Sequence, residues 1–212
     1  IIVLCGPGNN GGDGFVIAKL LKNKGYLTGV YVLSNKRNYK GDALRALNDY
    51  NGKIRKISSL KIIKNALIID ALFGIGLRRD IKGKLIKVFN QIKKSNNKVV
   101  SIDIPSGISS DTGKIMGSAI KAHYTVTFHK KKLGHCINSG KEFSGKLKIV
   151  DIGFKKKKMK KTFLINSPNL WIKKFPSKKS FHHKYSRGKV VIFGGAKEFT
   201  GATILAAESA LR

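Results

Sequence analysis

Cysteine, acidic residues and long apolar runs are all scarce in this sequence of 212 residues. Two cysteines, Cys5 and Cys136, are too few for a disulfide framework, so we expect a reducing compartment, the cytoplasm. No apolar run approaches the roughly 20 residues that cross a bilayer, so we expect no membrane association. Nothing resembles a targeting segment. The chain opens without methionine on a strand-like run and stops within a helical pattern, which indicates a piece of a longer protein.

Acidic residues number 11 against 43 lysines and arginines, which gives a net charge of +32. Such an excess is typical of proteins that bind nucleic acids. Here nearly all of it is lysine, spread over every segment and without interleaved aromatic residues, so we expect no specific nucleic-acid partner. A basic nucleic-acid-binding module remains the alternative. The lysine run 155–161 is interpreted as a solvated linker.

Strand-like and helix-like segments alternate along the first three quarters of the chain. Strands are predicted at 1–5, 27–33, 66–70, 98–102, 124–128 and 147–150, and helices at 12–24, 41–51 and 84–95. Strands that alternate with helices form a parallel sheet with helices on both faces. The sequence therefore predicts an α/β fold, a Rossmann-like three-layer sandwich with a mostly parallel sheet.

The segment 155–187 reads as a connector, because it is rich in lysine and interrupted by Pro168 and Pro176. After it, Val190 to Phe193 is predicted as a strand and Gly201 to Arg212 as a helix. We therefore expect a first domain over 1–154, a connector over 155–187 and the beginning of a second domain over 188–212.

The loop after the first strand contains Gly6-x-Gly8-x-x-Gly11, a spacing shared with the dinucleotide fingerprint of dehydrogenases. An NAD(P)-binding oxidoreductase is therefore an alternative function. The end of the second strand, however, carries no acidic residue for the adenosine ribose. What the loop does offer is backbone amides at a helix N-terminus, which suit a phosphate, and polar side chains on Asn9, Asn10 and Asp13.

Several segments of the first domain carry a family resemblance: GPGNNGGDGFVIAKLL, IIDALFGIGL, VVSIDIPSGISSDTG, YTVTFHKKKLG and VDIGF follow one another from residue 6 to residue 154. Together they resemble the NAD(P)HX epimerase family, also called the YjeF N-terminal family. The resemblance implies a homodimer or higher homo-oligomer that interconverts the R and S epimers of NADHX and NADPHX, the hydrates of the reduced nicotinamide cofactors.

The resemblance also implies which residues form the site. A potassium ion is expected on Asn10, Asp70 and Ser106, and hard oxygen ligands of this kind suit that cation. Asp70 could equally be a helix cap or turn residue. The hydrate is expected to contact residues of three strand-end loops: Asn9, Asn10, Gly11, Gly12, Asp13, Gly74, Ile75, Gly76, Leu77, Arg78, Arg79, Asp80 and Asp103.

Epimerisation at carbon six of the nicotinamide ring requires an acid/base group beside the ring. We expect Asp103 to be that group, because it sits at a strand end before a turn fixed by Pro105. Lys132 is the candidate counter-charge, although a solvated side chain is at least as common in a run of three lysines. The histidines His129, His135, His182 and His183 lack the spacing of a transition-metal site, and we expect none.

The closing stretch GKVVIFGGAKEFTGATILAAESALR resembles the opening of the NAD(P)HX dehydratase domain, which has a ribokinase-like fold. The resemblance implies a bifunctional parent protein that uses ADP or ATP to dehydrate the S epimer. Since only the opening of that domain is present, this chain is not expected to carry dehydratase activity. The helices that precede the first strand in the epimerase family are also absent.

Overall fold

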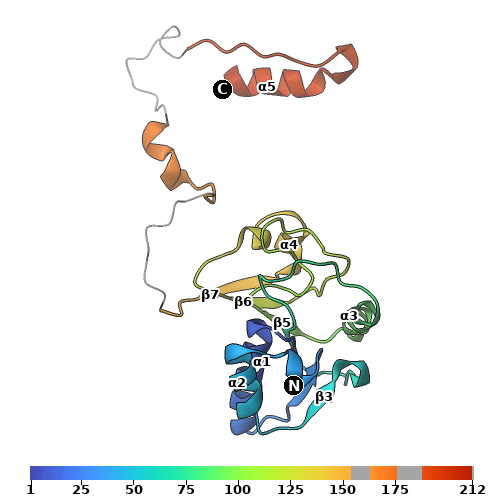
Figure 1. Cartoon of the computed structure of the whole chain (residues 1–212). Helices are drawn as coiled ribbons and strands as arrows, with labels where there is room; N and C mark the ends of the chain where they lie inside the picture. Colours follow the sequence, from blue (N-terminus) through green and yellow to red (C-terminus); the bar gives the residue numbers. More distant parts are fainter. Residues whose placement is uncertain (154–162, 176–187, 212) are drawn as a thin grey trace. The chain divides into compact units, whose positions relative to one another are not determined.

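The computed structural model describes residues 1–153, 163–175 and 188–211, in two units, Ile1–Lys160 and Lys161–Arg212 (Figure 1). Each unit is described by itself. The lysine run 155–161 and the pair His182 and His183 lie outside the described residues.

The first unit is built on one sheet of parallel strands in the order β3-β2-β1-β4-β5-β6-β7. Its strands are β1 (Ile2–Cys5), β2 (Gly29–Val32), β3 (Ile54–Lys56), β4 (Ile68–Ala71), β5 (Val99–Ile102), β6 (Tyr124–Phe128) and β7 (Lys146–Val150). Its α-helices are α1 (Asn9–Asn23), α2 (Gly41–Asp49), α3 (Lys84–Ser95) and α4 (Asn138–Phe143), and a 3-10 turn, η3 (Leu133–His135), precedes α4. The predicted α/β fold with a parallel sheet is confirmed, and β3 and α4 are additions to it.

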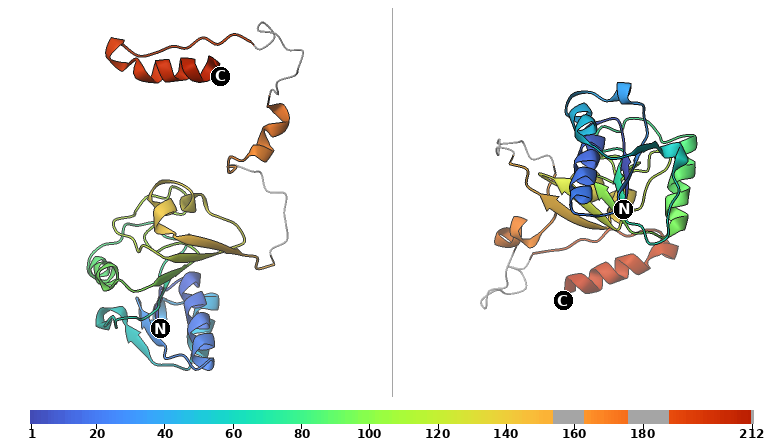
Figure 2. Two further views of the ribbon diagram at one scale, coloured as in Figure 1. Left: turned by 180° about the vertical axis from the view of Figure 1, so that it is seen from behind. Right: turned by 90° about the horizontal axis from the view of Figure 1, so that it is seen from below.

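Apolar strands separate two helical layers, because successive side chains of a strand point to opposite faces. Val3 and Cys5 of β1 pack with α1 and α2 on one face. Ile2 and Leu4 pack with α3 on the other. Figure 2 shows α1 and α2 together on one side of the sheet and α3 on the opposite side. Both strand faces are buried, which explains why β1 reads as a continuous apolar run.

The sheet has its switch point between β1 and β4, where the connections leave in opposite directions. Ligands of open parallel sheets bind at such a point, beyond the carboxyl ends of the strands. Helix α1 can begin close behind β1 because two glycines allow close backbone approach. A Cβ atom on Gly6 would lie 1.7 Å from the carbonyl oxygen of Leu72, and one on Gly11 would lie 1.8 Å from that of Gly6.

In the second unit, helix α5 (Gly201–Leu211) forms where the sequence predicted a helix. The strand predicted over Val190 to Phe193 is not formed. Val190 is 70% exposed and Phe193 is 94% exposed. Residues 163–175 and 188–211 contain no strand at all. A strand requires a neighbour for its backbone hydrogen bonds, and the described residues of this unit offer none. Within the described part of the chain, no helix is long and apolar enough to span a membrane.

Candidate functional site

A crevice of about 600 Å³ lies at the switch point of the sheet. Two loops form it, one after β1 and one after β4, and the lining residues are Pro7, Gly8, Asn9, Asn10, Leu72, Phe73, Gly74, Ile75, Gly76, Leu77, Arg78 and Arg79. Most of the residues predicted to contact a dinucleotide hydrate therefore meet in one place.

The N-terminus of α1 opens into this crevice. Gly8 is the N-cap and provides no side-chain cap, and its carbonyl oxygen accepts the N–H of Gly12 as the first turn closes. The amides that begin a helix have no partner within it and favour an anion. Arg78 and Arg79 line the same crevice, and the exposed guanidinium group of Arg78 lies 3.6 Å from the carboxylate of Asp111. A phosphate group of a ligand would find both kinds of donor here.

Asn10 carries an unsatisfied amide inside the site. Its Oδ1 and Nδ2 atoms are both buried, and neither has a hydrogen-bond partner within the described residues. The backbone at Gly74 passes so close that a Cβ atom there would lie 3.4 Å from the Cβ of Asn10. Burying an unpaired amide costs about 1–3 kcal/mol, so this side chain is suited to a ligand or a cation.

Three other predicted contact residues have different surroundings. Gly11 and Gly12 are buried packing positions, and a Cβ atom on Gly12 would lie 3.0 Å from the Cα of Ala43 in α2. Asp80 is exposed. None of the three lines the crevice, although the backbone amide of Gly11 belongs to the first turn of α1.

Asp70, at the end of β4, is fully buried and accepts four hydrogen bonds. Ser106 donates twice, from its hydroxyl to Oδ1 at 2.5 Å and from its amide to Oδ2 at 2.9 Å. The hydroxyl of Ser101 donates to Oδ2 at 2.8 Å, and the amide of Leu72 to Oδ1 at 3.3 Å. Burial raises the pKa of Asp70, and the hydrogen bonds from Ser106, Ser101 and Leu72 oppose that rise.

This arrangement fits a potassium ion. A buried carboxylate without a cationic partner gains from a nearby positive charge. Asp70 supplies the charge, and the unpaired oxygen of Asn10 supplies a hard neutral ligand. Ser106 joins Asp70 to the crevice, because its hydroxyl also accepts the amide N–H of the lining residue Phe73 at 2.9 Å. Asp70 and Ser106, which form the floor of the site, are hydrogen-bonded to the lining residues Leu72 and Phe73, and Asn10 lines the crevice itself.

Asp103, directly after β5, adopts a strained backbone conformation with φ of 66°. The amide of Ile104 donates to the carbonyl of Ile102 at 2.9 Å across it, which is the pattern of a classic γ-turn. Strain of this kind is a mark of functional sites. The turn aims the Asp103 carboxylate at β6, where the hydroxyl of Thr127 donates to Oδ1 at 3.1 Å.

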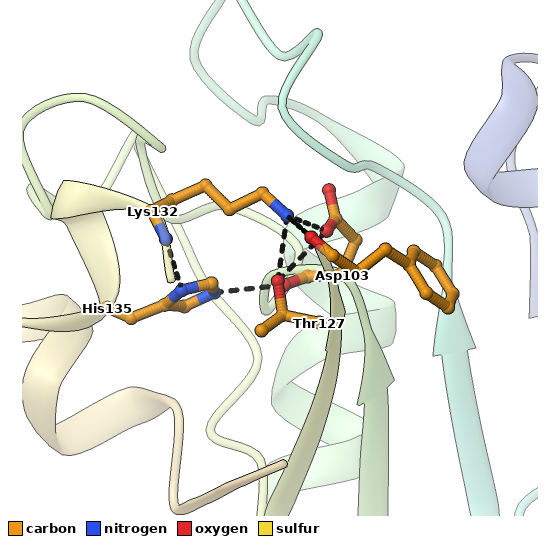
Figure 3. A network of polar contacts seen from close by, with 5 residues as sticks. Asp103, Thr127, Lys132 and His135 are labelled. Carbon is orange, nitrogen blue, oxygen red and sulfur yellow. Dashed lines mark hydrogen bonds and ion pairs between the residues drawn. The ribbon is translucent and has the colours of Figure 1, made fainter. Parts of the chain in front are cut away.

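Lys132 forms an ion pair with that carboxylate (Figure 3). Its Nζ also donates to the hydroxyl of Thr127 at 2.8 Å and to the carbonyl of Phe128 at 3.1 Å. The side chains of Lys132 and Asp103 are only 20% and 13% exposed. Lys132 is therefore a buried partner of Asp103 and not one of the solvated lysines around it.

Asp13 completes the group from the second turn of α1. It is half-buried, and burial, then the charge of Asp103, raise its pKa to about 6. Residues three apart on a helix lie on the same side, so Asp13 and Asn10 share a face of α1. The crevice and the Asp103–Lys132 pair are thus connected along this helix at the carboxyl edge of the sheet.

Sequence reasoning did not identify Ser101, Thr127 or His135 as parts of the site. Their contacts with Asp70 and Asp103 depend on which strands and loops are neighbours, and the sequence analysis considered His135 only as a metal ligand. In the described part of the chain, no cluster of histidine, cysteine and acidic residues could hold a transition metal.

Comparison with known proteins identifies relatives of the whole chain. The family described as YjeF-related protein N-terminus matches residues 1–134. The chain is 41% identical over 157 residues to the NAD(P)H-hydrate epimerase of Levilactobacillus brevis, covering 72% of each chain. It is 35% identical over 227 residues to the bifunctional NAD(P)H-hydrate repair enzyme Nnr of Moorella thermoacetica, which covers all of this chain and 43% of the relative. The crystal structure of yeast ynu0, YNL200c, superposes with a TM-score of 0.55 at 25% identity, over 71% of this chain and 65% of that one.

Proposed function

The chain belongs to the family of YjeF-related protein N-termini, and from that membership and its site geometry we propose that it is an NAD(P)H-hydrate epimerase. The reaction interconverts the R and S forms of hydrated NADH and NADPH. The observation that carries the proposal is the buried ion pair of Asp103 and Lys132, held at the same sheet edge as a crevice with anion-binding groups.

In this proposal the crevice binds the dinucleotide part of the hydrate. The free amides of α1 and the guanidinium groups of Arg78 and Arg79 hold the phosphates. Gly74 lies against Asn10, whose buried amide can both donate to and accept from the ligand.

Asp103 acts as the acid/base group at the reacting carbon. The Asp103 carboxyl group donates a proton to the hydroxyl on carbon six, which leaves as water while the electron pair of the ring nitrogen stabilises the carbon. The resulting carboxylate takes a proton back from the water that adds to the opposite face of the ring. Lys132 balances the charge of the carboxylate, and Thr127 fixes its orientation. Asp13, with a pKa of about 6, can hold a proton below about pH 6 on the α1 side of the site.

Asn10, Asp70 and Ser106 hold a potassium ion in the same proposal. The bound ion supplies a fixed positive charge beside the buried carboxylate of Asp70. The protein's own contribution is the serine pair, Ser101 and Ser106, whose hydrogen bonds favour the ionised form of that carboxylate and orient it.

The chain spans less than half the length of the bifunctional relatives it matches. We infer that residues 1–154 form the epimerase domain, that 155–187 connect it onward, and that 188–212 begin a dehydratase domain that uses ADP or ATP. A homodimer or higher homo-oligomer, a cytoplasmic location, and no specific nucleic-acid partner belong to the same proposal.

The decisive experiment is the Asp103→Asn variant. It keeps the size of the side chain but removes the base, so the rate of R-to-S conversion should fall by roughly 100-fold or more, while hydrate binding changes little. The two epimers are separated chromatographically over time, with the spontaneous reaction subtracted. Asp49→Asn, on the exposed end of α2, is the matched control. Near-normal turnover of a folded Asp103→Asn protein would move the acid/base role elsewhere, first to Lys132.

A further inference from the structure

His135 is a buried histidine that touches both members of the proposed catalytic pair through their backbones. It is 5% exposed, and it belongs to the turn η3 between β6 and α4. Its Nδ1 atom lies 3.1 Å from the amide nitrogen of Lys132, and its Nε2 atom lies 2.9 Å from the carbonyl oxygen of Asp103 (Figure 3). The imidazole ring therefore bridges two segments that are far apart in the sequence.

The two contacts fix the protonation state of the ring. The amide of Lys132 can only donate, so Nδ1 must be the unprotonated acceptor, and Nε2 must carry the proton that goes to the Asp103 carbonyl. Only the neutral imidazole satisfies both partners. Burial lowers the pKa of His135, as do the charges of Lys132 and Lys131, while the carbonyl contact and the charge of Asp103 oppose them. The ring is accordingly neutral around pH 7.

The carbonyl that His135 binds belongs to the strained residue of the site. Asp103 sits in the γ-turn, and such conformations persist only where the surroundings hold them. The amide of Asp103 is held by the carbonyl of Val126 at 2.7 Å, and the carbonyl of Asp103 is held by His135. One backbone group on each side of the Asp103 side chain is thus fixed.

The loop that carries His135 is itself anchored. The amide of Gly134 donates to the carbonyl of Ser110 at 2.7 Å, and a Cβ atom on Gly134 would lie 2.2 Å from the carbonyl oxygen of Ser109. This close approach leaves the loop little freedom. Whatever fixes His135 therefore fixes the backbone of Lys132 as well.

We propose that His135 is a positioning residue that orients the Asp103–Lys132 pair chiefly through its hydrogen bond to the Asp103 carbonyl, with the Lys132 amide contact as a second anchor for the ring. It does not touch the hydrate. Its effect on turnover rests on the proposed epimerase function, whereas its effect on the ion pair does not.

Three substitutions separate the two contacts of His135. In His135→Gln the amide nitrogen reaches the place of Nε2 and keeps the contact with the Asp103 carbonyl. In His135→Asn the amide oxygen takes the place of Nδ1 and keeps only the contact with the Lys132 amide. His135→Phe keeps the ring volume and neither contact. The matched control is His123→Asn. Nδ1 of His123 also accepts a hydrogen bond from a backbone amide, that of Val99, at 3.1 Å, and His123 does not line the crevice.

We expect kcat per folded molecule to fall about 10-fold in His135→Asn and His135→Phe, since a displacement of about 1 Å is enough for such a loss. The KM should change less than about threefold, because the crevice is untouched. His135→Gln should keep kcat within about threefold of the parent, and His123→Asn should leave it unchanged. The folded fraction of each variant is taken from its thermal unfolding curve.

A second measurement needs no epimerase activity. Competitive acetylation followed by mass spectrometry gives the reactivity of each lysine, and Lys132 should react about 10-fold faster in His135→Asn and His135→Phe than in the parent and in His135→Gln. Lys121, which pairs with Glu142 on the surface, is the internal reference. If the parent protein shows no epimerase activity, the proposed function fails. The Lys132 labelling would still test whether His135 positions the ion pair. Equal Lys132 labelling in all variants, or a kcat that follows only the folded fraction, would overturn the proposal.

Discussion

The two serines that bind Asp70 give the sharpest test of the site floor. Ser101 and Ser106 are both fully buried, and each hydroxyl donates to the carboxylate. They differ in what else they do. The hydroxyl of Ser106 also accepts a hydrogen bond from the amide of Phe73, whereas the hydroxyl of Ser101 donates to Asp70. Replacing each by alanine therefore compares one lost contact with two.

The expected magnitudes follow from that count. A hydrogen bond to a charged group contributes about 1.5–3 kcal/mol, and a buried N–H left without a partner costs about 1–3 kcal/mol. Ser101→Ala should therefore lower the free energy of unfolding by about 1.5 kcal/mol. Ser106→Ala removes a donor to Asp70 and leaves the Phe73 amide without its acceptor, so this variant should lower the free energy of unfolding by about 3 kcal/mol.

Potassium distinguishes the two variants further, because only Ser106 is a proposed ligand. A cation that binds the folded state alone stabilises it by RT ln(1 + [L]/Kd), or about 1.4 kcal/mol at ten times Kd. The parent and Ser101→Ala should show this gain in potassium over sodium at equal ionic strength. Ser106→Ala should lose most of it.

Urea unfolding followed by circular dichroism is the appropriate assay. The single tryptophan, Trp171, lies in the second unit, so tryptophan fluorescence would not report on the sheet. The reasoning fails if Ser101→Ala is as costly as Ser106→Ala, or if Ser106→Ala keeps the full potassium effect.

Three further substitutions test the loop after β1 and the beginning of α1. The folded-state pKa of Asp13, about 6, lies above its ordinary value of 3.8, so its contribution favours folding below about pH 4 and is lost as the pH rises through 6. Because the side chain is half-exposed, Asp13→Asn should raise the free energy of unfolding at pH 7 by only on the order of 1 kcal/mol, with no gain at pH 4, in paired urea titrations. Gly6→Ala should cost more than about 3 kcal/mol, because its Cβ would overlap the Leu72 carbonyl, whereas Gly8→Ala, which meets no atom within 4 Å, should change the urea midpoint little. A tolerated Gly6→Ala would show that the loop can shift.

The sequence was sufficient for the central strands and insufficient for the short elements. β1, β4 and β5 are largely apolar runs that are buried on both faces, and such burial produces a continuous apolar segment that is easy to identify in a sequence. β3 is three residues long and fully exposed, so its residues carry no alternation to detect. The strand expected over 190–193 has the right composition, but composition cannot supply the neighbouring strand that it requires.

The same distinction holds for the site. Ser106, in the loop after β5, was expected from the family resemblance alone. Asp70, near the end of β4, and Asp103, directly after β5, could be predicted from their positions, because ligands of this fold bind at the ends of parallel strands. Ser101 could not, because its contact with Asp70 depends on the register between β4 and β5, which places the two residues side by side. Nothing in the local sequence of β5 specifies that register.

The strained turns show how the fold brings together Asp103 and Lys132, the pair that the sequence predicted. β5 and β6 are neighbours, and both are followed by a residue with positive φ, Asp103 at 66° and His129 at 65°. In each case the amide of the next residue donates to the carbonyl of the preceding one, at 2.9 and 2.7 Å. Local preference disfavours this γ-turn. Its repetition at adjacent strand ends is therefore imposed by the tertiary structure, which folds both chain segments over the same edge. That folding brings a carboxylate from one turn against an ammonium group from the loop after the other, and the conformational cost is concentrated where the proposed chemistry needs the two groups to meet.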